Sequence, residues 1–417
     1  MPKALKKTII ISGAIIMLVI AAFTIFFITR EKITFQDAAF EASIKKALNK
    51  NDTIYNYDLY FIDSIIILSD EACLINREAD MTITERGCLY NTDEITSYGE
   101  ITSLEDIKYF PKLKKLTVIN NMVTTLPDLM NSKIEYMNLA HNSIVDIKNI
   151  GQYKTLYSIN LSYNMIKDIS NVSLSQTITN LNLKANAIGD AQVLASVQDL
   201  KELNISYNYL NNVDFLSSLK GLSDLDISHN EIDNLSAIAD LNKLSCLNIS
   251  FNRIKAIEKL NCGSSLKYLN AMNNEISYIN TTFEKLREGN LANNALKKDF
   301  DLAQFPSAEI IQLDFNQISN LINFPKERLH TLTISCNELR QVEFTCEMNS
   351  ITNMDISGNP VDDISSVSQF CPKLVQLNIS DTKVTDISTL KSSRELNTLV
   401  AFNLGADTSI LKCAVIK

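Results

Sequence analysis

Apolar residues from Leu113 onward follow one repeated pattern, in which leucine or isoleucine alternates with polar residues and an asparagine comes three positions after the last of them. The pattern LxxLxLxxNxI reads LKELNISYNYL from Leu200 and LSDLDISHNEI from Leu222. Alternation with a period of two predicts a short strand in each repeat. A unit this small cannot bury its own apolar side, so neighbouring units should stack and their strands should form a parallel sheet.

The asparagine of this template recurs about every 22 residues, a period typical of stacked repeats. Its side-chain amide can donate to and accept from the backbone of adjacent coils, so we interpret these residues as a structural ladder. A thirteenth repeat, from Leu374, has Thr382 at this place, and a fourteenth, from Leu396, has lost the pattern, as a capping repeat would. The ladder consists of Asn121, Asn142, Asn164, Asn186, Asn208, Asn230, Asn252, Asn274, Asn294, Asn316, Asn337 and Asn359.

The template resembles that of the leucine-rich repeat family, and the apolar residues after the asparagine (DISNV, DNLSAI, DDISSV) resemble its bacterial internalin-like branch. Residues 33–62, with Asp37 and the Asp58-Leu59 pair, are similar to the helical N-terminal cap of such proteins. The resemblance implies an α/β repeat solenoid: a curved array with a parallel β-sheet on the concave face, short 3-10 or irregular convex segments and a small helical cap. It also implies recognition of another macromolecule on the concave face.

The N-terminal segment contains no charged residue from 8 to 29. As a helix it would be about 33 Å long, enough to cross a bilayer core of about 30 Å. We therefore predict a transmembrane helix at 8–29 after a cytoplasmic tail at 1–7, and Lys3, Lys6 and Lys7 favour an inside N-terminus. The predicted localisation is the cell membrane, crossed once, with the repeats outside the cell. A cleaved signal peptide is the alternative for this segment.

The remaining chain divides into a cap at 33–97 and a repeat domain at 98–417, with about 14 repeats including the degenerate last one. Apolar residues Phe40, Ile44 and Leu48 predict a helix from about Asp37 to Asn49. Residues 68–97 break the pattern and are interpreted as an insertion in the cap. Cys73 and Cys88 lie in it, and a disulfide between them would stabilise the fold by roughly 3 kcal/mol, with two free thiols as the alternative.

Composition excludes several kinds of chemistry. The net charge of -9 disfavours nucleic acid as a partner, because binding it requires clustered Lys and Arg. The sequence has three histidines and no HExxH or CxxC motif, and no two glycines are close enough for a phosphate-binding loop. We therefore expect no metal, no small-molecule cofactor and no enzymatic activity.

The residue directly before the template asparagine is repeatedly aromatic or imidazole, and further tyrosines lie two or three places into their strands. Since one template position on neighbouring strands forms a column, these side chains predict a continuous surface on the concave face. Exposed aromatic residues of this density mark protein-binding surfaces, although rings that merely pack along their neighbours are the alternative. The candidate binding residues are His141, Tyr163, Tyr207, His229, Phe251, Tyr136, Tyr157, Tyr268 and Phe315.

The sequence thus favours a membrane-anchored extracellular protein that recognises a protein or a cell-surface polymer through its concave face. Two other functions stay open. One is a structural or envelope-organising protein without a specific soluble ligand. The other is a regulatory subunit of an intracellular phosphatase, since such subunits share the 22-residue period, although the apolar segment argues against it.

Overall fold

The computed structural model describes residues 30–69, 71–76, 98–129, 132–258, 260–325 and 327–417. The chain forms two compact units, Met1–Met165 and Ile166–Lys417. The boundary lies within the predicted repeat domain, between the asparagine of one repeat and the apolar residue that follows it.

The first unit contains the cap and the first coils of the array. Its elements are α2 (Ala38–Ala47), α3 (Asn56–Leu59), β1 (Ile62–Leu68), β2 (Glu71–Asn76), the 3-10 helix η3 (Glu105–Tyr109), β3 (Lys115–Ile119), β4 (Tyr136–Asn138), η4 (Lys148–Gln152) and β5 (Ser158–Asn160). Strands β3, β4 and β5 pair in parallel, and each residue pairs with the residue at the same template position of the neighbouring strand.

Helix α2 begins where the sequence predicts, because Asp37 caps it. The Asp37 carboxylate accepts a hydrogen bond from the Phe40 backbone N–H at 2.9 Å and from the N–H groups of Thr102 (2.8 Å) and Ser103 (2.9 Å). Asp106, which is buried, accepts in turn from the Asp37 N–H at 2.9 Å. Two carboxylates thus tie the start of the cap helix to the first coil.

The predicted insertion at 68–97 is partly regular structure. Strand β2 pairs antiparallel with β1, and β1 pairs in parallel with β3. Residues 71–76 therefore extend the sheet of the first unit, although they do not follow the repeat template. Residues 77–97 lie outside the described part of the chain.

The predicted membrane localisation is corrected by the structure. Within residues 30–417, as far as they are described, no helix is long and apolar enough to cross a membrane. The longest described helix, α2, has 10 residues, so it is about 15 Å long against a bilayer core of about 30 Å. The segment predicted to be transmembrane, 8–29, and the tail at 1–7 lie outside the described residues.

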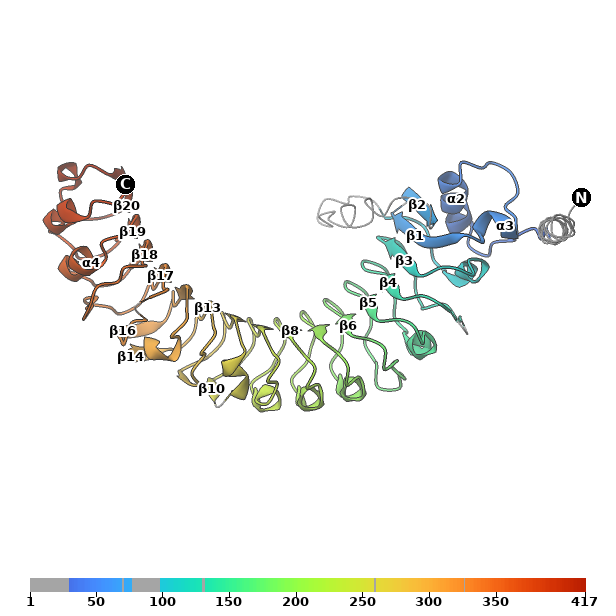
Figure 1. The fold of residues 1–417 in the computed structure, drawn as a ribbon, viewed down its shortest axis with the longest axis horizontal. Helices are drawn as coiled ribbons and strands as arrows, with labels where there is room; N and C mark the ends of the chain where they lie inside the picture. Colours follow the sequence, from blue (N-terminus) through green and yellow to red (C-terminus); the bar gives the residue numbers. More distant parts are fainter. Residues whose placement is uncertain (1–29, 70, 77–97, 130–131, 259, 326) are drawn as a thin grey trace, which may run out of the picture. The chain divides into compact units, whose positions relative to one another are not determined.

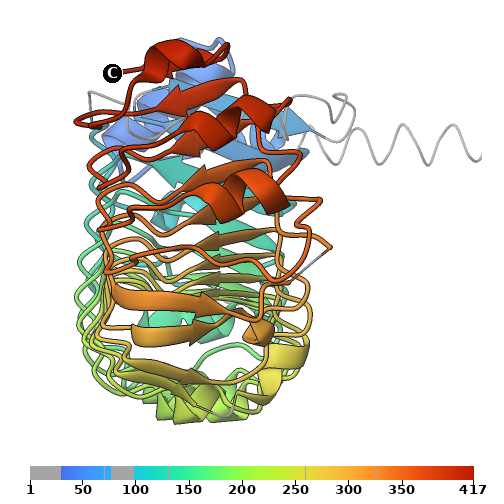
Figure 2. The ribbon, with the colours of Figure 1, turned by 90° about the vertical axis from the view of Figure 1, so that its left-hand side faces the viewer.

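The second unit is a stack of coils whose strands run side by side on the inner side (Figures 1 and 2). Each strand pairs in parallel with the next, residue for residue, so that one template position forms one row. These strands are β6 (Asn180–Asn182), β7 (Glu202–Asn204), β8 (Asp224–Asp226), β9 (Cys246–Asn248), β11 (Tyr268–Asn270), β13 (Glu288–Asn290), β15 (Ile310–Gln312), β17 (Thr331–Thr333), β18 (Asn353–Asp355), β19 (Gln376–Asn378), β20 (Thr398–Val400) and β21 (Ala414–Ile416).

The outer side of the second unit carries mainly short 3-10 helices, because about eight residues per repeat leave no room for longer ones. The 23-residue repeat from Ile351 to Leu374 fits a short α-helix instead, and the 20-residue step between Asn274 and Asn294 has an extended segment there. The outer elements are η5 (Gln192–Ser196), η6 (Asp214–Ser218), η7 (Ser236–Ile238), η8 (Asn261–Ser264), η9 (Leu302–Gln304), η10 (Ser388–Ser392), η11 (Thr408–Ile410), α4 (Ser365–Phe370) and the paired strands β10 (Ala256–Glu258) with β12 (Tyr278–Asn280) and β14 (Lys297–Asp301) with β16 (Gln317–Ile322).

The template asparagines connect successive coils. The Asn208 amide nitrogen donates to Leu183 O of the preceding coil (3.0 Å) and to Ile205 O (3.1 Å) and Ser206 O (3.1 Å) of its own coil, and Oδ1 accepts from the Ile188 N–H at 2.9 Å. Corresponding bonds join Asn142, Asn164, Asn230, Asn252, Asn274, Asn316 and Asn359 to their coils.

The ladder changes at its ends. Asn121 donates to Ser69 O of the cap and accepts from the Ile101 N–H, so it links the first coil to the hairpin of β1 and β2. Thr382, which replaces the asparagine, donates from its hydroxyl to Ile379 O at 2.7 Å. A hydroxyl can fill only part of the amide's role, because it has a single hydrogen to donate.

Candidate protein-binding surface

The residue before each template asparagine adopts a left-handed backbone conformation throughout the array. Its φ lies between 52° and 64° at Asn120, His141, Tyr163, Ala185, Tyr207, His229, Phe251, Asn273, Asn293, Phe315, Cys336, Gly358, Asp381 and Asn403. At this point the chain turns inward from the strand, and the backbone N–H of Tyr207, for example, donates to Ser228 O of the next coil at 3.0 Å. The local conformation is thus fixed by the packing of successive coils.

Three rings at this position stack on one another in the second unit. The ring centroids of Tyr207 and His229 are 3.8 Å apart with an interplanar angle of 14°, and those of His229 and Phe251 are 4.0 Å apart at 13°. Tyr207 remains 47% exposed and Phe251 43% exposed. We call Tyr207, His229 and Phe251 the ring stack. Since the ring faces cover one another, the stack presents mainly ring edges to solvent.

The residue types of the ring stack are not those that favour the left-handed backbone conformation of this position. Asparagine, aspartate and glycine adopt the left-handed region at little cost, and they occupy this position in six of the coils above. The bulky side chains of Tyr207 and Phe251 are outliers there, at a cost of about 1 to 3 kcal/mol each, whereas histidine adopts this region more readily. Stacking returns only about 0.5 to 1.5 kcal/mol per pair. Such local violations of a structural rule gather at functional sites.

The structure divides the predicted binding residues into separate groups. In the first unit His141 and Tyr163 stack with centroids 4.2 Å apart. Phe315 is exposed, but its neighbours at the same position are Asn293 and Cys336, so no ring stacks on it there. Tyr136 and Tyr268 begin strands β4 and β11, and Tyr157 directly precedes β5.

The predicted continuous column on one face therefore differs from what the structure contains. The ring stack follows the carboxyl ends of the strands β7, β8 and β9, three residues beyond the last strand residue in each case. Tyr268 lies at the opposite end of its strand. The sequence template predicts exposed side chains both at the start of the strand and directly before the asparagine. The backbone shows that the chain turns between these two positions.

His229 has an unusual electrostatic environment for an exposed surface. Burial between its two neighbours lowers the pKa of the imidazole, the negative charge of Asp226 opposes this shift, and Lys184 adds to it. The Lys184 ammonium lies 5.3 Å from the centroid of the Tyr207 ring. The ring stack thus favours a neutral imidazole in its centre.

A second row of polar side chains, which the sequence reasoning did not assign, lies on the strand face. The Asn204 Oδ1 accepts hydrogen bonds from the Ser206 N–H (3.1 Å) and hydroxyl (2.7 Å), and Asp226 and Asn248 make the same pair with Ser228 and Ser250. The signal was visible as the repeated NxS sequence. These bonds satisfy the backbone where the strand ends and the inward turn begins.

No family model matches the sequence, and no curated protein matches it. Solved structures decide the fold. An internalin, InlF, from Listeria monocytogenes str. 4b F2365 is similar with a TM-score of 0.63 and 21% identity, covering 88% of this chain and 95% of that chain. The chain has a leucine-rich repeat fold.

Two further structures agree with this assignment. The functional domain of InlJ from Listeria monocytogenes has a TM-score of 0.63 at 18% identity, covering 88% of this chain and 80% of that one. The LRIM1/APL1C complex gives 0.60 at 19% identity, covering 82% of this chain and 63% of that one. The predicted fold class, a leucine-rich repeat solenoid with a parallel β-sheet and short 3-10 or irregular outer segments, is confirmed. These identities are too low to carry a ligand or a location to this chain.

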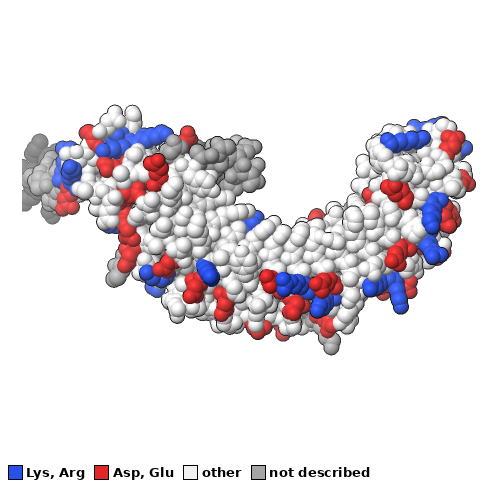
Figure 3. All heavy atoms as spheres, turned by 180° about the vertical axis from the view of Figure 1, so that it is seen from behind, with Lys and Arg blue, Asp and Glu red and all other residues white. Residues whose placement is uncertain are grey.

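The described residues support neither a metal site nor a nucleic-acid site. Among the described residues no group of three His, Cys, Asp or Glu is placed to hold a metal ion. Cys73 is exposed on β2, whereas Cys88 lies outside the described residues, so the predicted disulfide stays a prediction. On the face shown in Figure 3 basic side chains are interspersed with acidic ones, without the basic stripe that nucleic-acid binding requires.

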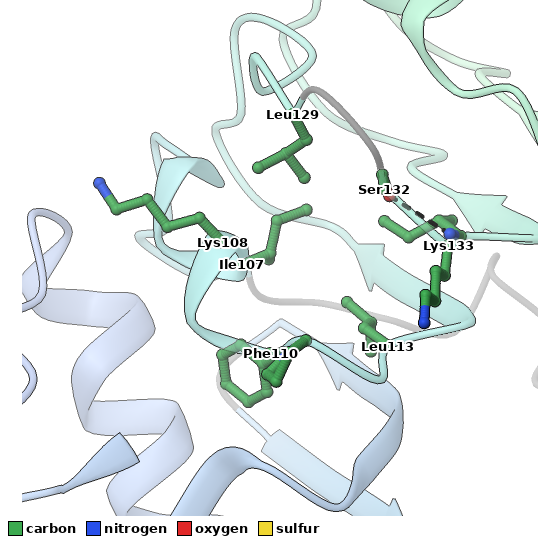
Figure 4. Close-up of a pocket in the computed structure, with 9 residues that line it drawn as sticks. Ile107, Lys108, Phe110, Leu113, Leu129, Ser132 and Lys133 are labelled. Carbon is green, nitrogen blue, oxygen red and sulfur yellow. Dashed lines mark hydrogen bonds between the residues drawn. The ribbon is translucent and has the colours of Figure 1, made fainter. Parts of the chain in front are cut away.

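The first unit contains a small cavity of about 150 Å³ lined by apolar side chains, among them Ile107, Leu113 and Leu129, and by polar ones such as Ser132 and Lys133. The ammonium group of Lys108 points away from these side chains (Figure 4). All the residues that line it belong to the first unit, whereas the ring stack belongs to the second. It therefore adds nothing to the candidate site.

Proposed function

We propose that this leucine-rich repeat protein is a recognition module that binds another protein through the ring stack and the adjoining strand face of the second unit. The observation that carries the proposal is the presence of bulky, exposed rings in a left-handed conformation that asparagine or glycine would adopt more cheaply. Stacking of the rings on one another offsets only part of that backbone cost. Aromatic residues supply much contact area at low entropic cost, and they dominate the energetics of protein interfaces.

The surroundings of the ring stack support the same proposal. Tyr209, two residues after Tyr207, is 64% exposed, so the same coil exposes a second large aromatic side chain. Structures of this fold include complexes with other proteins, as in LRIM1/APL1C. The His141–Tyr163 pair repeats the arrangement in the first unit and is proposed as a further contact point.

Site-specific photocrosslinking tests the proposal in the producing cells. A benzoylphenylalanine placed at Tyr209 should crosslink to a discrete protein partner. The matched control carries the same group at Tyr278, which is 49% exposed but begins β12 on the outer side. The partner band should disappear in a variant with Tyr207, His229 and Phe251 replaced by Ala. Identical bands from both positions, or a band that survives the triple replacement, would contradict the proposed surface.

A further inference from the structure

The strand face of the coils that carry the ring stack has three acidic side chains on two neighbouring strands, of which Asp226 ends its strand next to the turn that leads to the stack. Glu202 of β7 is directly opposite Asp224 of β8 in the parallel register, and Asp226 lies two residues further along β8, on the same side of the sheet. Like charges opposite one another on neighbouring strands are destabilising. We call Glu202, Asp224 and Asp226 the acidic cluster.

None of these three carboxylates takes part in an ion pair among the described residues, although the charge of Lys184 acts on the adjacent His229. Asp224 accepts a hydrogen bond from the Ser223 hydroxyl, and Asp226 accepts from the N–H and the hydroxyl of Ser228. These donors are neutral, so they orient the carboxylates without compensating their charge.

The amide side chains on either side of the acidic cluster indicate which other groups a partner would present to this surface. Asn204 and Asn248 occupy the same row as Asp226 on the adjacent strands. Their Oδ1 atoms already accept two hydrogen bonds each, from Ser206 and Ser250. What such a side chain can offer a partner is its amide N–H, which matches a carbonyl oxygen.

The ring stack lies on the same three coils and is close enough for the charge of Asp226 to influence His229. Its exposed ring edges provide an apolar contact beside the acidic cluster. The ring faces inside the stack are covered and Lys184 of this chain already lies 5.3 Å from the centroid of the Tyr207 ring, so the stack offers a partner mainly ring edges and not a free cation site. The cationic and the apolar parts of a partner would thus contact different groups of this surface.

From these three features we infer that the surface recognises an extended polypeptide segment with a Lys or Arg side chain next to an apolar one. The basic side chain contacts the acidic cluster, the apolar side chain covers the ring stack, and backbone carbonyls accept from Asn204 and Asn248. A neutral sugar polymer would match the amides but leave three carboxylates without a counter-charge. The inference rests on the proposed function and specifies its partner.

Selection of peptides from a random 12-residue phage library on the immobilised full chain tests this inference. Synthetic versions of the selected peptides are then measured by fluorescence polarisation. We expect enrichment of Lys or Arg beside aromatic or aliphatic residues and an affinity that falls as salt is raised. Selected peptides without basic residues, or no peptide above background, would overturn the inference.

Variants separate this inference from the proposed function. The change Glu202→Gln with Asp224→Asn and Asp226→Asn should weaken peptide binding by about tenfold or more. The control Glu284→Gln with Glu347→Gln and Glu395→Gln removes the same charge from exposed sites outside the acidic cluster, and binding should stay within about twofold.

Circular dichroism establishes that each variant is folded. Loss of binding in the ring variant (Tyr207, His229 and Phe251 to Ala) with full binding in the acidic-cluster variant would leave the proposed function standing and refute the basic partner. Binding that is indifferent to both variants would refute both. An equal loss in the control variant would mean that net charge, not the cluster, attracts the peptide.

Discussion

Tyr207 and His229 lie face to face with their ring centroids 3.8 Å apart, although the chain places them 22 residues apart. This distance is shorter than the roughly 4.8 Å between neighbouring strands, so the rings lean together beyond what the backbone spacing imposes. Because coils stack in a repeat array, residues at the same template position of successive coils lie next to one another and form a continuous surface. The two alternatives drawn from the sequence, packing and binding, therefore both have a structural basis here, and stability measurements can separate them.

Replacing a member of the ring stack by asparagine should change stability little. Tyr207→Asn loses stacking worth about 0.5 to 1.5 kcal/mol but relieves a left-handed backbone cost of about 1 to 3 kcal/mol. The expected change in the free energy of unfolding is below about 1 kcal/mol. Urea titration followed by circular dichroism measures it. Ile205→Ala, which truncates a fully buried side chain of the same coil, should cost about 2 to 5 kcal/mol. Equal costs for the two variants would show that the ring belongs to the core.

The asparagine ladder should contribute strongly to stability at each site. Asn230 donates to Ile205 O and Ile227 O and accepts from the Leu210 N–H. Asn230→Ala leaves these buried groups without partners, at about 1 to 3 kcal/mol. Asn211→Ala changes an exposed asparagine and should stay within about 0.5 kcal/mol. If the two variants unfold at the same urea concentration, the ladder amides do not act as buried partners.

The cap should lose stability in acid through Asp37. Burial opposes ionisation of this carboxyl, but hydrogen bonds from Phe40, Thr102 and Ser103 outweigh burial and lower its pKa below 3.8. A lowered folded-state pKa means that the contribution is complete above the unfolded value and is lost as the pH falls through the folded one. Asp37→Asn should therefore destabilise the chain at pH 7 and flatten the pH dependence below about pH 4. Thermal unfolding at pH 7, 4 and 3 measures both effects, and an unchanged slope in Asp37→Asn would assign the acid sensitivity to other groups.

Two cysteines should react slowly with thiol reagents. Burial raises the pKa of Cys262 to about 11 and that of Cys371 to about 12, and both side chains are fully buried. Since the thiolate is the reactive species, both should stay unmodified by iodoacetamide at pH 8 in the folded protein. Cys336 is exposed and serves as the internal control. Peptide mass spectrometry reads all three, and modification of Cys262 as fast as Cys336 would indicate local opening of that coil.

The sequence predicts the repeated part of each coil better than the exceptions. Leu203 and Ile205 are buried as the alternating pattern requires, because a period of two is enough to decide which side of a strand faces the core. Asp37 caps its helix as its place before an amphipathic stretch predicts. Both results depend on the conformation of a few consecutive residues, which the residue types are enough to predict.

Two structural features could not be predicted from the residue types alone. In the sequence template, Tyr207 and Tyr268 both occupy positions whose side chains face away from the core. Tyr268 begins its strand, whereas Tyr207 lies in the left-handed turn that follows the end of its strand. Strand β2 pairs with β1 although its sequence does not follow the repeat, since strand pairing here is set by a neighbour in space. The Asn204–Ser206 bonds follow the repeated NxS sequence, but their place at the end of the strand is visible only in the structure.

His229 provides a test of the ring stack in solution. Burial lowers the pKa of its imidazole, so its histidine Cε1–H signal, assigned by its absence in His229→Gln, should titrate below the ordinary value of about 6.5. Phe251→Ala uncovers one face of the ring and should raise the pKa, whereas Asp226→Asn removes the opposing charge and should lower it further. Because the folded-state pKa is lowered, protonation favours the unfolded chain, and stability should be complete above pH 6.5 and decrease as the pH falls below it. The decrease between pH 7.5 and 5.5 should be smaller in His229→Gln. A titration at or above the ordinary value would show that the three rings do not stay stacked in solution.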